Sequence, residues 1–354
     1  MEISNIEFIR LDLKMKSGYT IAYESIDEAS NVILKITTSD GLTGWGCAAP
    51  DLEITRETAE DVISNVENLV VPMLKNEDPF QIIRFHEELK AKKPNMRSTL
   101  AMVNIALYDL LARKAGVPMY QLLGGYRKKI QTSITIGIEP LDVTMALARD
   151  YWQQGFRILK LKGGLDLDED VEKVYKLRET LGKELTLRFD ANQGYQVGQS
   201  VQFTERTKAA EIQILEQPTP YGNDDAMRAV VENVEVPVMA DESIRTLKDA
   251  FRLSKHGSTD MINIKIMKVG GLTEAQHINS VAKAAGLEVM IGCLDECALG
   301  IAAGLHFALS KPNVEYADLD GHLDFINDPL EGLFTIKNGW ICPTDDAGLG
   351  PVNL

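Results

Sequence analysis

The sequence predicts an α/β protein in which a closed barrel of parallel strands follows a smaller α+β domain. From residue 131 onward, short apolar runs typical of buried strands alternate with amphipathic, helix-like segments. Such alternation implies parallel strands joined by crossover helices, and eight runs within about 190 residues fit a closed barrel better than an open sheet. The turn "TIGIEP" after the first run also lacks the glycine-rich phosphate loop that an open, doubly wound sheet would carry.

The first domain is predicted to span residues 1–125. It opens with two extended segments, "ISNIEFIRLDL" and "SNVILKITTSDGLTGWG", and continues with helical patterns. In "STLAMVNIALYDLLARKAG" apolar residues recur at helical spacing, and Gly116 and Pro118 mark the end of that helix. Strands followed by helices are typical of an α+β domain, and this one closes at "LLGG".

The barrel is predicted to span residues 126–319, and its strands are expected in eight apolar runs. In chain order these runs are "TSITIG", "RILKLK", "LTLRFDA", "IQILEQ", "VPVMADE", "MINIKI", "LEVMIG" and "VEYADLD". The remaining residues, 320–354, contain "GLFTIKNGWICP", in which Asn338 and Gly339 predict the tight turn of a hairpin. We expect this last segment to pack back on the first domain and to complete it.

Composition and charge argue against several classes of function. The net charge of −15 disfavours a nucleic-acid partner, because binding to the phosphate backbone requires clustered Lys and Arg. The N-terminus does not resemble a signal peptide, and no run reaches the roughly 18 apolar residues that a membrane span needs. We therefore expect a cytoplasmic protein with four reduced thiols, at Cys47, Cys293, Cys297 and Cys342.

Charged residues mark the ends of five successive predicted strands. They follow one another at intervals of one strand-helix unit, and in barrels of this kind the catalytic residues come from the carboxyl ends of several strands. The set is Lys160, Lys162, Asp190, Glu216, Asp241 and Lys265. A single charged strand end is often a solvated cap, but six such residues in register indicate a site.

The three acids of this set, Asp190, Glu216 and Asp241, predict a Mg²⁺ site, because an all-oxygen donor set with open positions suits this cation. The alternative is that the lysines merely neutralise the acids. We disfavour it, since lysines alone would leave the third acid unpaired. Mg²⁺ beside a lysine could hold a substrate carboxylate and stabilise the enediolate that forms when the α-proton leaves.

The lysines of the set predict proton transfer. Lys160 and Lys162 lie two residues apart on one strand and therefore share a face. We expect Lys160 to pair with the substrate carboxylate and Lys162 to act as a general base. Lys265 lies four strands further around the ring, so it would face the same carbon from the opposite side. Two bases that flank one carbon predict racemisation or epimerisation.

These motifs resemble those of the enolase superfamily, and specifically of its muconate-lactonising subgroup. The resemblance covers nearly the whole chain: "DGLTGWG" and "ALYDLLARKAGVPMYQLLGG" carry it in the first domain, and "KLK", "FDANQGY", "EQP", "ADES" and "NIKIMKVGG" carry it in the barrel. It implies a (β/α)7β TIM-like barrel with an α+β capping domain whose mobile loops close over the substrate. It also implies that Asp190, Glu216 and Asp241 bind the metal and that Lys162 and Lys265 are the acid/base pair.

Within this subgroup, "YADLDG" resembles the D-x-D signature of dipeptide epimerases. The resemblance implies that Asp318 and Asp320 bind the α-ammonium group of the substrate's N-terminal residue. Paired acids opposite a metal-bound carboxylate would measure a zwitterion of fixed length, whereas the plainer alternative is that they cap a barrel strand. The predicted substrate is a small dipeptide, and the sequence leaves open whether the chain forms a homo-oligomer.

Acids in three loops suggest which side chains the substrate carries. In dipeptide epimerases that act on Ala-Glu, an arginine of the capping domain receives the acidic side chain, and Glu24 stands at the matching position here. Asp51, Glu53, Asp295 and Glu296 add further acids, with no arginine to balance them. Because an acid in this place repels glutamate and attracts a cation, we expect a preference for L,L-dipeptides carrying Lys or Arg, epimerised at the C-terminal residue. The alternative is that these acids only reflect the surface of an acidic protein.

Other functions stay open at this point. An Ala-Glu epimerase or an o-succinylbenzoate synthase would share the lysines, although a synthase needs no acidic pair for an ammonium group. An acid-sugar dehydratase is disfavoured, because such enzymes generally use a histidine on the second barrel strand or a His-Asp dyad. A Schiff-base lysine aldolase without metal is the alternative from another class. Lys268 is expected to be structural, because its odd offset from Lys265 breaks the strand's alternation, and Asn192 is expected to support the metal site.

Overall fold

The N-terminal part of the chain is an antiparallel sheet with helices packed against it. The structure is a computed structural model, and it describes residues 1–354 except 21, 23 and 24. Strands β1 (Ile3–Thr20), β2 (Ser25–Thr38) and β3 (Thr43–Ala48) form this sheet in the order β1-β2-β3. The helical elements that follow are α1 (Ala59–Asn65), η1 (Val66–Val70), α2 (Val71–Leu74), α3 (Ile82–Lys92), α4 (Arg97–Ala115) and α5 (Met119–Leu122).

Two glycines allow α4 to pack directly on β3. A Cβ atom added at Gly44 would lie 2.5 Å from the carbonyl oxygen of Ala106, and one added at Gly46 would lie 2.0 Å from that of Met102. Only a residue without a side chain permits this approach, which explains the glycines in the segment "DGLTGWG". The helix ends where the sequence predicts, at Gly116, which adopts the left-handed conformation (φ 70°) of a helix C-cap.

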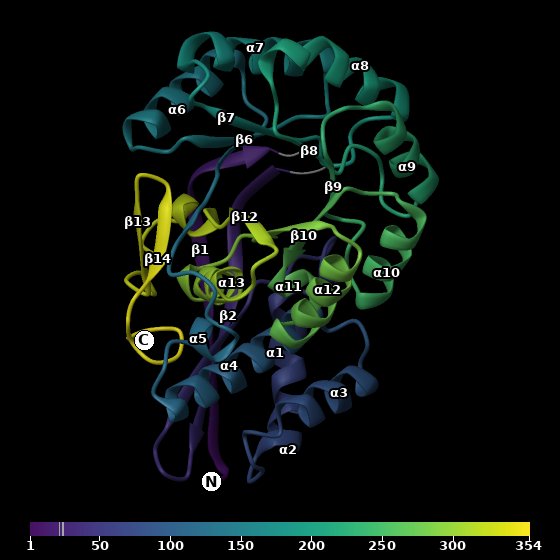
Figure 1. The fold of residues 1–354 in the computed structure, drawn as a ribbon. Helices are drawn as coiled ribbons and strands as arrows, with labels where there is room; N and C mark the ends of the chain where they lie inside the picture. Colours follow the sequence, from purple (N-terminus) through teal and green to yellow (C-terminus); the bar gives the residue numbers. More distant parts are fainter. Residues whose placement is uncertain (21, 23–24) are drawn as a thin grey trace.

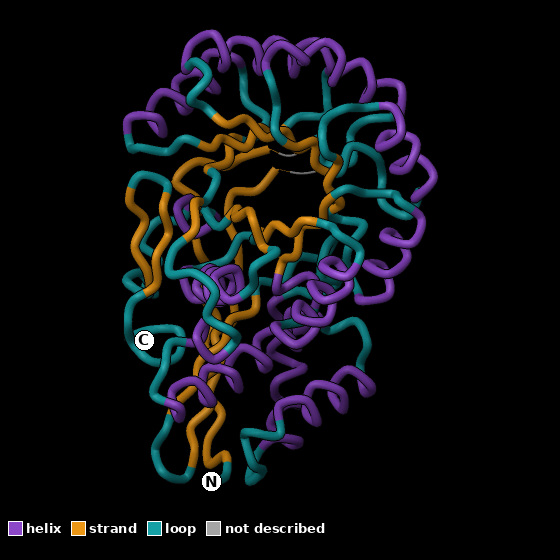
Figure 2. Tube along the Cα trace, in the orientation of Figure 1, coloured by secondary structure: helices purple, strands orange, loops and turns teal. Residues whose placement is uncertain are grey.

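Eight parallel strands form the barrel, and they coincide with the eight runs predicted from the sequence. They are β5 (Ile134–Ile136), β6 (Ile158–Lys162), β7 (Thr186–Asp190), β8 (Ile214–Glu216), β9 (Val238–Ala240), β10 (Met261–Lys265), β11 (Glu288–Gly292) and β12 (Val314–Asp318). A parallel bridge between Thr132 and Ala317 joins the start of the first strand to the last one and closes the ring. Figure 2 shows this ring of strands with the helices outside it.

Every crossover between successive barrel strands carries a helix. The helical elements are α6 (Leu141–Gln153), α7 (Leu167–Leu181), α8 (Val197–Thr207) with η2 (Lys208–Ala210), α9 (Asp224–Asn233), α10 (Leu247–His256), α11 (Ile266–Val269), α12 (Leu272–Ala284) and α13 (Ala298–Ser310). The last strand is followed by the short 3-10 helix η3 (Gly321–Asp324). This is the predicted (β/α)7β arrangement, with a separate antiparallel sheet before it (Figure 1). Among the described residues, none of the helices combines the length and the apolar character needed to cross a membrane.

The C-terminal residues form the predicted hairpin. Strands β13 (Phe334–Lys337) and β14 (Trp340–Pro343) pair across Asn338 and Gly339, which both have positive φ angles. The hairpin adds to the two-residue strand β4 (Ile130–Gln131) at the start of the barrel. Beyond it, the amide of Met119 donates to the carbonyl oxygen of Gly348 (2.8 Å), so the tail also contacts α5. The division of the chain into domains at residues 125 and 126 stays a prediction.

The long β1–β2 ribbon brings the first sheet to the mouth of the barrel. Met15 forms a bridge with Phe325, which follows η3, and Lys16 Nζ donates to the carbonyl oxygen of Leu323 (2.7 Å). The amide of Ile138, in the loop after β5, donates to the carbonyl oxygen of Thr20 (2.8 Å). The N-terminal sheet therefore helps to enclose the carboxyl ends of β5 and β12.

Candidate active site

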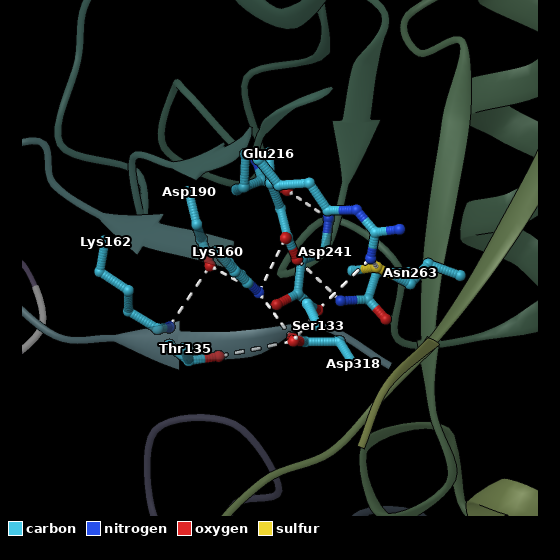
Figure 3. Close-up of polar contacts among 12 residues, drawn as sticks. Ser133, Thr135, Lys160, Lys162, Asp190, Glu216, Asp241, Asn263 and Asp318 are labelled. Carbon is cyan, nitrogen blue, oxygen red and sulfur yellow. Dashed lines mark hydrogen bonds and ion pairs between the residues drawn. The ribbon is translucent and has the colours of Figure 1, made fainter. Parts of the chain in front are cut away.

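Polar side chains gather at the carboxyl ends of the barrel strands because the strand register aligns them. Lys162 ends β6 beside Asp190 of β7, which lies beside Glu216 of β8. Lys265 ends β10, and Asp318 ends β12. Residues that are far apart in the sequence therefore meet at one end of the barrel, where Lys162, Lys265 and Asp318 line a cavity. Figure 3 shows how the charged ends of the labelled lysines and acids converge.

Lys160 lies at the centre of this cluster. Its Nζ forms ion pairs with Asp190 Oδ2 (3.0 Å), Glu216 Oε2 (2.8 Å) and Asp318 Oδ2 (2.9 Å), and the residue is 2% exposed. Burial alone would lower the pKa of this ammonium group, but the three carboxylates outweigh burial and hold its pKa well above the usual value. Lys160 is therefore a fixed positive charge that holds three acids together.

Two further lysines hold Asp241. Lys265 Nζ lies 2.9 Å from Asp241 Oδ2, and Lys268 Nζ forms an ion pair with Asp241 Oδ1 and donates to the carbonyl oxygen of Asn263 (3.1 Å). Against the effect of burial, these lysines hold the pKa of Asp241 well below its usual value. The sequence predicted a structural role for Lys268, because its offset from Lys265 falls outside the alternation of the strand, but it did not indicate the contact with Asp241. Since β10 gives way to α11 directly after Lys265, a helical turn brings Lys268 back to the same acid.

The expectation that lysines alone would leave the third acid unpaired is wrong. Lys160 contacts two of the three acids and Lys268 adds a fourth lysine, so Asp190, Glu216 and Asp241 each have a lysine partner. With Asp318 and Glu242 the cluster holds five carboxylates against four lysines, so negative charge is in excess. Burial, followed by repulsion from Asp190, raises the pKa of Glu216 to about 7 in spite of Lys160.

The acid Glu242 contributes to this excess. It follows Asp241 directly in the chain, and burial together with the charges of Asp241 and Asp190 raises its pKa to about 8. Its Oε2 atom has no hydrogen-bond partner in the part of the chain that the structure describes. The sequence motif "ADES" contains this acid, but the sequence alone does not tell that it faces the cluster.

Lys162 is oriented by two acceptors. Its Nζ donates to Asp190 Oδ2 (3.3 Å) and to Asn192 Oδ1 (3.1 Å). The backbone amide of Asn192 in turn donates to Asp190 Oδ1 (2.9 Å). Asn192 thus contacts both Asp190 and Lys162, which agrees with the supporting position expected from the sequence. Lys162 is less buried than Lys160 and lines the cavity.

Asp318 and Asp320 both line the cavity but differ in how their charges are compensated. Asp318 accepts hydrogen bonds from Lys160 Nζ (2.9 Å) and Ser133 Oγ (2.6 Å), which overcome burial and lower its pKa to about 2. Asp320 Oδ2 accepts from the amide of Thr135 (2.6 Å). Burial, followed by the charge of Asp318, raises the pKa of Asp320 to about 8. The D-x-D pair therefore consists of one compensated acid and one acid for which the described residues supply no ion-pair partner.

The structure corrects part of the predicted set of loop acids. Asp51 and Asp295 line the cavity, and Asp51 Oδ1 also accepts from the amide of Ile54 (2.8 Å). Glu53 does not line it: its exposed side chain lies in an adjoining hollow, 3.8 Å from Arg56. Arg56 belongs to the same loop, so the premise that no arginine balances these acids is wrong.

The two remaining acids of the predicted set are Glu296 and Glu24. Glu296 does not line the cavity, because its side chain turns under its own loop, where Oε1 accepts from the amide of Leu294 (3.0 Å). Burial raises the pKa of Glu296 to about 7. Glu24 lies outside the described residues.

Sequence motifs did not indicate one wall of the cavity. Glu139 in the loop after β5, Leu147 and Tyr151 of α6, and Asp324 at the end of η3 form this wall. These residues come from a loop, the side of a helix and a 3-10 turn. Since their meeting depends on the fold and not on a local spacing, no periodic pattern could have shown it.

Two family models and several known proteins match the sequence of this chain. The family model "Mandelate racemase / muconate lactonizing enzyme, N-terminal domain" matches residues 5–124, and the model "Enolase C-terminal domain-like" matches residues 143–352. An L-Lys-D/L-Arg epimerase from Methylococcus capsulatus is 36% identical over 353 residues, which cover 99% of each chain.

Two solved structures are similar over their full length. The L-Ala-D/L-Glu epimerase from Bacillus subtilis, in a substrate-liganded complex, has a TM-score of 0.97 and 33% identity, with all of both chains covered. The dipeptide epimerase from Enterococcus faecalis V583, complexed with Mg and the dipeptide L-Leu-L-Tyr, has a TM-score of 0.95 and 34% identity, again with all of both chains covered. The three relatives thus differ in the side chains of their substrates, although they are similar to this chain to the same degree.

Proposed function

Because this chain belongs to the enolase superfamily, with both domains of the mandelate racemase and muconate lactonizing enzymes, we propose that it is a Mg²⁺-dependent dipeptide epimerase. We propose further that it inverts the α-carbon of the C-terminal residue and prefers dipeptides that carry Lys or Arg. The observation that carries the proposal is the position of Lys162 and Lys265, which line one cavity from β6 and β10.

Epimerisation requires two groups that exchange protons with opposite faces of one carbon atom. The strands β6 and β10 are four steps apart in a ring of eight, so their ends face each other across the cavity. In one direction the amine of one lysine takes the α-proton, and the ammonium group of the other lysine delivers a proton to the opposite face. In the reverse direction the two lysines exchange these tasks. Asp190 and Asn192 orient Lys162, and Asp241 orients Lys265.

The carboxylate cluster fits the metal that the relatives suggest. Asp190, Glu216 and Asp241 offer only oxygen atoms and are almost fully buried, which suits a hard divalent cation. Burial, followed by repulsion from Asp190, raises the pKa of Glu216, and Oε2 of Glu242 has no hydrogen-bond partner among the described residues, so a nearby cation would stabilise both carboxylates. We propose that the first three acids hold Mg²⁺. When bound, the cation would offset their repulsion and polarise the substrate carboxylate, which acidifies the adjacent α-carbon.

The D-x-D pair is proposed to fix the other end of the dipeptide. The α-ammonium group of the N-terminal residue would lie beside Asp320, where it would relieve the repulsion from Asp318. Asp318 itself stays bonded to Lys160 and Ser133, so it positions the site more than it binds. The distance between the carboxylate cluster and Asp320 then selects a molecule with the length of a dipeptide.

The cationic preference is supported by the acids that line the cavity. Asp51, Asp295, Asp318 and Asp320 all belong to its walls, and a positive side chain would find a favourable potential there. The Methylococcus relative is named for Lys and Arg, which agrees with this assignment.

A second candidate is a dipeptide with an acidic C-terminal residue. In the hollow next to the cavity, Arg56 donates to the hydroxyl group of Tyr221 (3.2 Å), and the guanidinium group of Arg245 stacks on the same ring (4.2 Å). Ile54 and Asn192 line both the hollow and the cavity. Because Arg245 lines this hollow, an acidic side chain that extended past Ile54 and Asn192, such as the glutamate named for the Bacillus relative, would meet a basic group.

A panel of L,L-dipeptides incubated in D₂O with Mg²⁺ tests the proposal. Deuterium gain at the α-carbon of the C-terminal residue reports the chemistry, and kcat/KM for Lys-Lys, Ala-Lys, Leu-Tyr and Ala-Glu reports the substrate class. We expect the highest value for Lys-Lys and loss of all exchange with EDTA. If no dipeptide gains deuterium the proposed reaction is wrong, and a preference for Ala-Glu would contradict the cationic class.

A variant at Glu24 tests the part of the prediction that rests on the sequence alone. Glu24→Arg should raise kcat/KM for Ala-Glu relative to Ala-Lys, because it replaces a carboxylate that is expected to attract cations with a guanidinium group that would repel them. Glu28→Arg, which makes the same charge change at an exposed position of β2, is the matched control and should leave the ratio unchanged. An equal response of both variants would mean that Glu24 acts only through the overall charge.

A further inference from the structure

One end of the cavity carries acids that the proposed chemistry does not use. Glu139 follows β5, and Asp324 ends η3, so they lie next to the carboxyl ends of the first and last barrel strands. Both residues are half-buried. Neither carboxylate forms a hydrogen bond or an ion pair with another described residue, which sets them apart from the acids of the central cluster.

The surroundings of Asp324 explain why an unpaired charge there is unfavourable. Burial, followed by repulsion from Asp295, raises the pKa of Asp324 to about 6. The charge of Lys16 acts in the opposite direction, but its ammonium group is bonded to the carbonyl oxygen of Leu323 (2.7 Å) and forms no ion pair with Asp324. A cation that entered this end of the cavity would therefore be bound by an acid that has no other partner.

The hollow that adjoins the cavity has the reverse balance. There Glu53 lies 3.8 Å from Arg56, and Arg245 stacks on Tyr221. Arg97, at the start of α4, is partly buried near Arg56 and Arg245. Acids without partners among the described residues are thus found at the end of the cavity formed by β5, β12 and η3, and basic side chains are found around the adjoining hollow.

The walls at the acidic end also match the shape of a long aliphatic chain with a charged tip. Leu147 and the ring of Tyr151 project from neighbouring turns of α6 and line the cavity between the loop after β5 and η3. Lys and Arg side chains bury their methylene groups along such apolar surfaces while the charged group reaches a polar partner. A neutral aliphatic side chain would leave Asp324 and Glu139 without a partner.

We propose that Asp324, together with Glu139 and Tyr151, forms the side-chain subsite for the N-terminal residue of the dipeptide and selects lysine or arginine at that position. This assignment rests on the proposed function, in which the α-ammonium group of the N-terminal residue lies beside Asp320. The side chain of the same residue then extends into the adjacent end of the cavity. Asp324 is the residue that determines charge, and Leu147 and Tyr151 accommodate the aliphatic stem.

Two pairs of substrates that differ in one charge test this assignment. L-Lys-L-Ala and L-norleucyl-L-Ala share nearly the same aliphatic stem, and only the former carries the terminal ammonium group. For the wild type we expect kcat/KM to favour L-Lys-L-Ala by about 10- to 30-fold, as one charge-assisted hydrogen bond provides. In Asp324→Asn, which keeps the shape but removes the charge, this ratio should fall to about threefold or less, since Glu139 alone remains. The corresponding ratio for L-Ala-L-Lys and L-Ala-L-norleucine should not change.

Controls separate the possible outcomes. Asp346→Asn removes an exposed acid near the C-terminus and should leave both ratios unchanged. Glu139→Gln should lower the first ratio, but less than Asp324→Asn does. The assignment is overturned if Asp324→Asn leaves the first ratio unchanged while the thermal midpoint stays that of the wild type, or if only the second ratio responds. If no dipeptide is epimerised, the proposed function fails. Calorimetric Kd values for the same substrate pairs then still decide whether Asp324 selects the charge.

Discussion

Replacing Lys268 with methionine tests whether this lysine stabilises the carboxylate cluster. Methionine keeps much of the aliphatic volume but removes the ammonium group that bonds Asp241 and the carbonyl oxygen of Asn263. Removing one partner of a buried ion pair costs about 3–5 kcal/mol, because an uncompensated charge is left behind. Asp241 keeps its ion pair with Lys265 at 2.9 Å, so we expect a loss near the lower limit, about 3 kcal/mol, in the free energy of unfolding.

Urea unfolding with and without Mg²⁺ measures this effect. The loss in Lys268→Met should be largest in metal-free protein and should shrink at saturating Mg²⁺, since a cation bound by Asp241 would compensate its charge. Lys176→Met is the matched control, because Lys176 is exposed and paired only with Glu179, and it should cost less than about 0.5 kcal/mol. A metal-free Lys268→Met protein as stable as the wild type would refute the assignment, and so would a loss that grows when Mg²⁺ is added.

Three further predictions follow from the same cluster and its surroundings. Lys162→Ala and Lys265→Ala should each abolish epimerisation in a coupled optical assay yet retain α-deuterium exchange for one substrate stereoisomer; full epimerisation by either variant would exclude the two-base mechanism. Asp190→Asn and Glu216→Gln should each weaken Mg²⁺ binding by calorimetry about tenfold or more, and unchanged affinity in both would exclude the metal site. Burial raises the pKa of Glu296 to about 7 from its ordinary 4.5, so the folded state keeps a proton that the unfolded state releases, and stability falls as the pH rises through this window. Glu296→Gln should therefore gain on the order of 3 kcal/mol over the wild type between pH 4 and pH 8, and parallel pH profiles of the two proteins would contradict this.

Much of the fold could be predicted because its signals are local. A buried parallel strand is a short apolar run whatever it later pairs with, and a helix end at Gly116 needs only a residue that tolerates positive φ. The partner against which a segment packs is not a local property, and the sequence signals it less clearly. The turn at Asn338 and Gly339 predicts a hairpin, but its pairing with β4 depends on an edge that is formed only when the barrel closes.

The same distinction explains what the sequence revealed of the site. Strand periodicity places Lys162, Asp190 and Glu216 at one level, since each ends a strand and neighbouring strands are in register. It cannot tell how far a side chain reaches. Lys160 contacts three acids, and Lys268 returns to the cluster through a helical turn, so the number of ion pairs was underestimated.

The residues that we propose to select the substrate are still less visible in the sequence, because they come from elements with no common period. Glu139 and Asp324 are 185 positions apart and meet only because the first and last strands of the ring are neighbours. Strand-end residues fix the reaction, whereas such loop residues are free to vary without disturbing the barrel. Relatives with the same reaction can therefore differ in substrate at similar overall identity. If Asp324 selects the side chain as we propose, the charge at the end of η3 is a better guide to the N-terminal residue of the substrate than the identity of the whole chain.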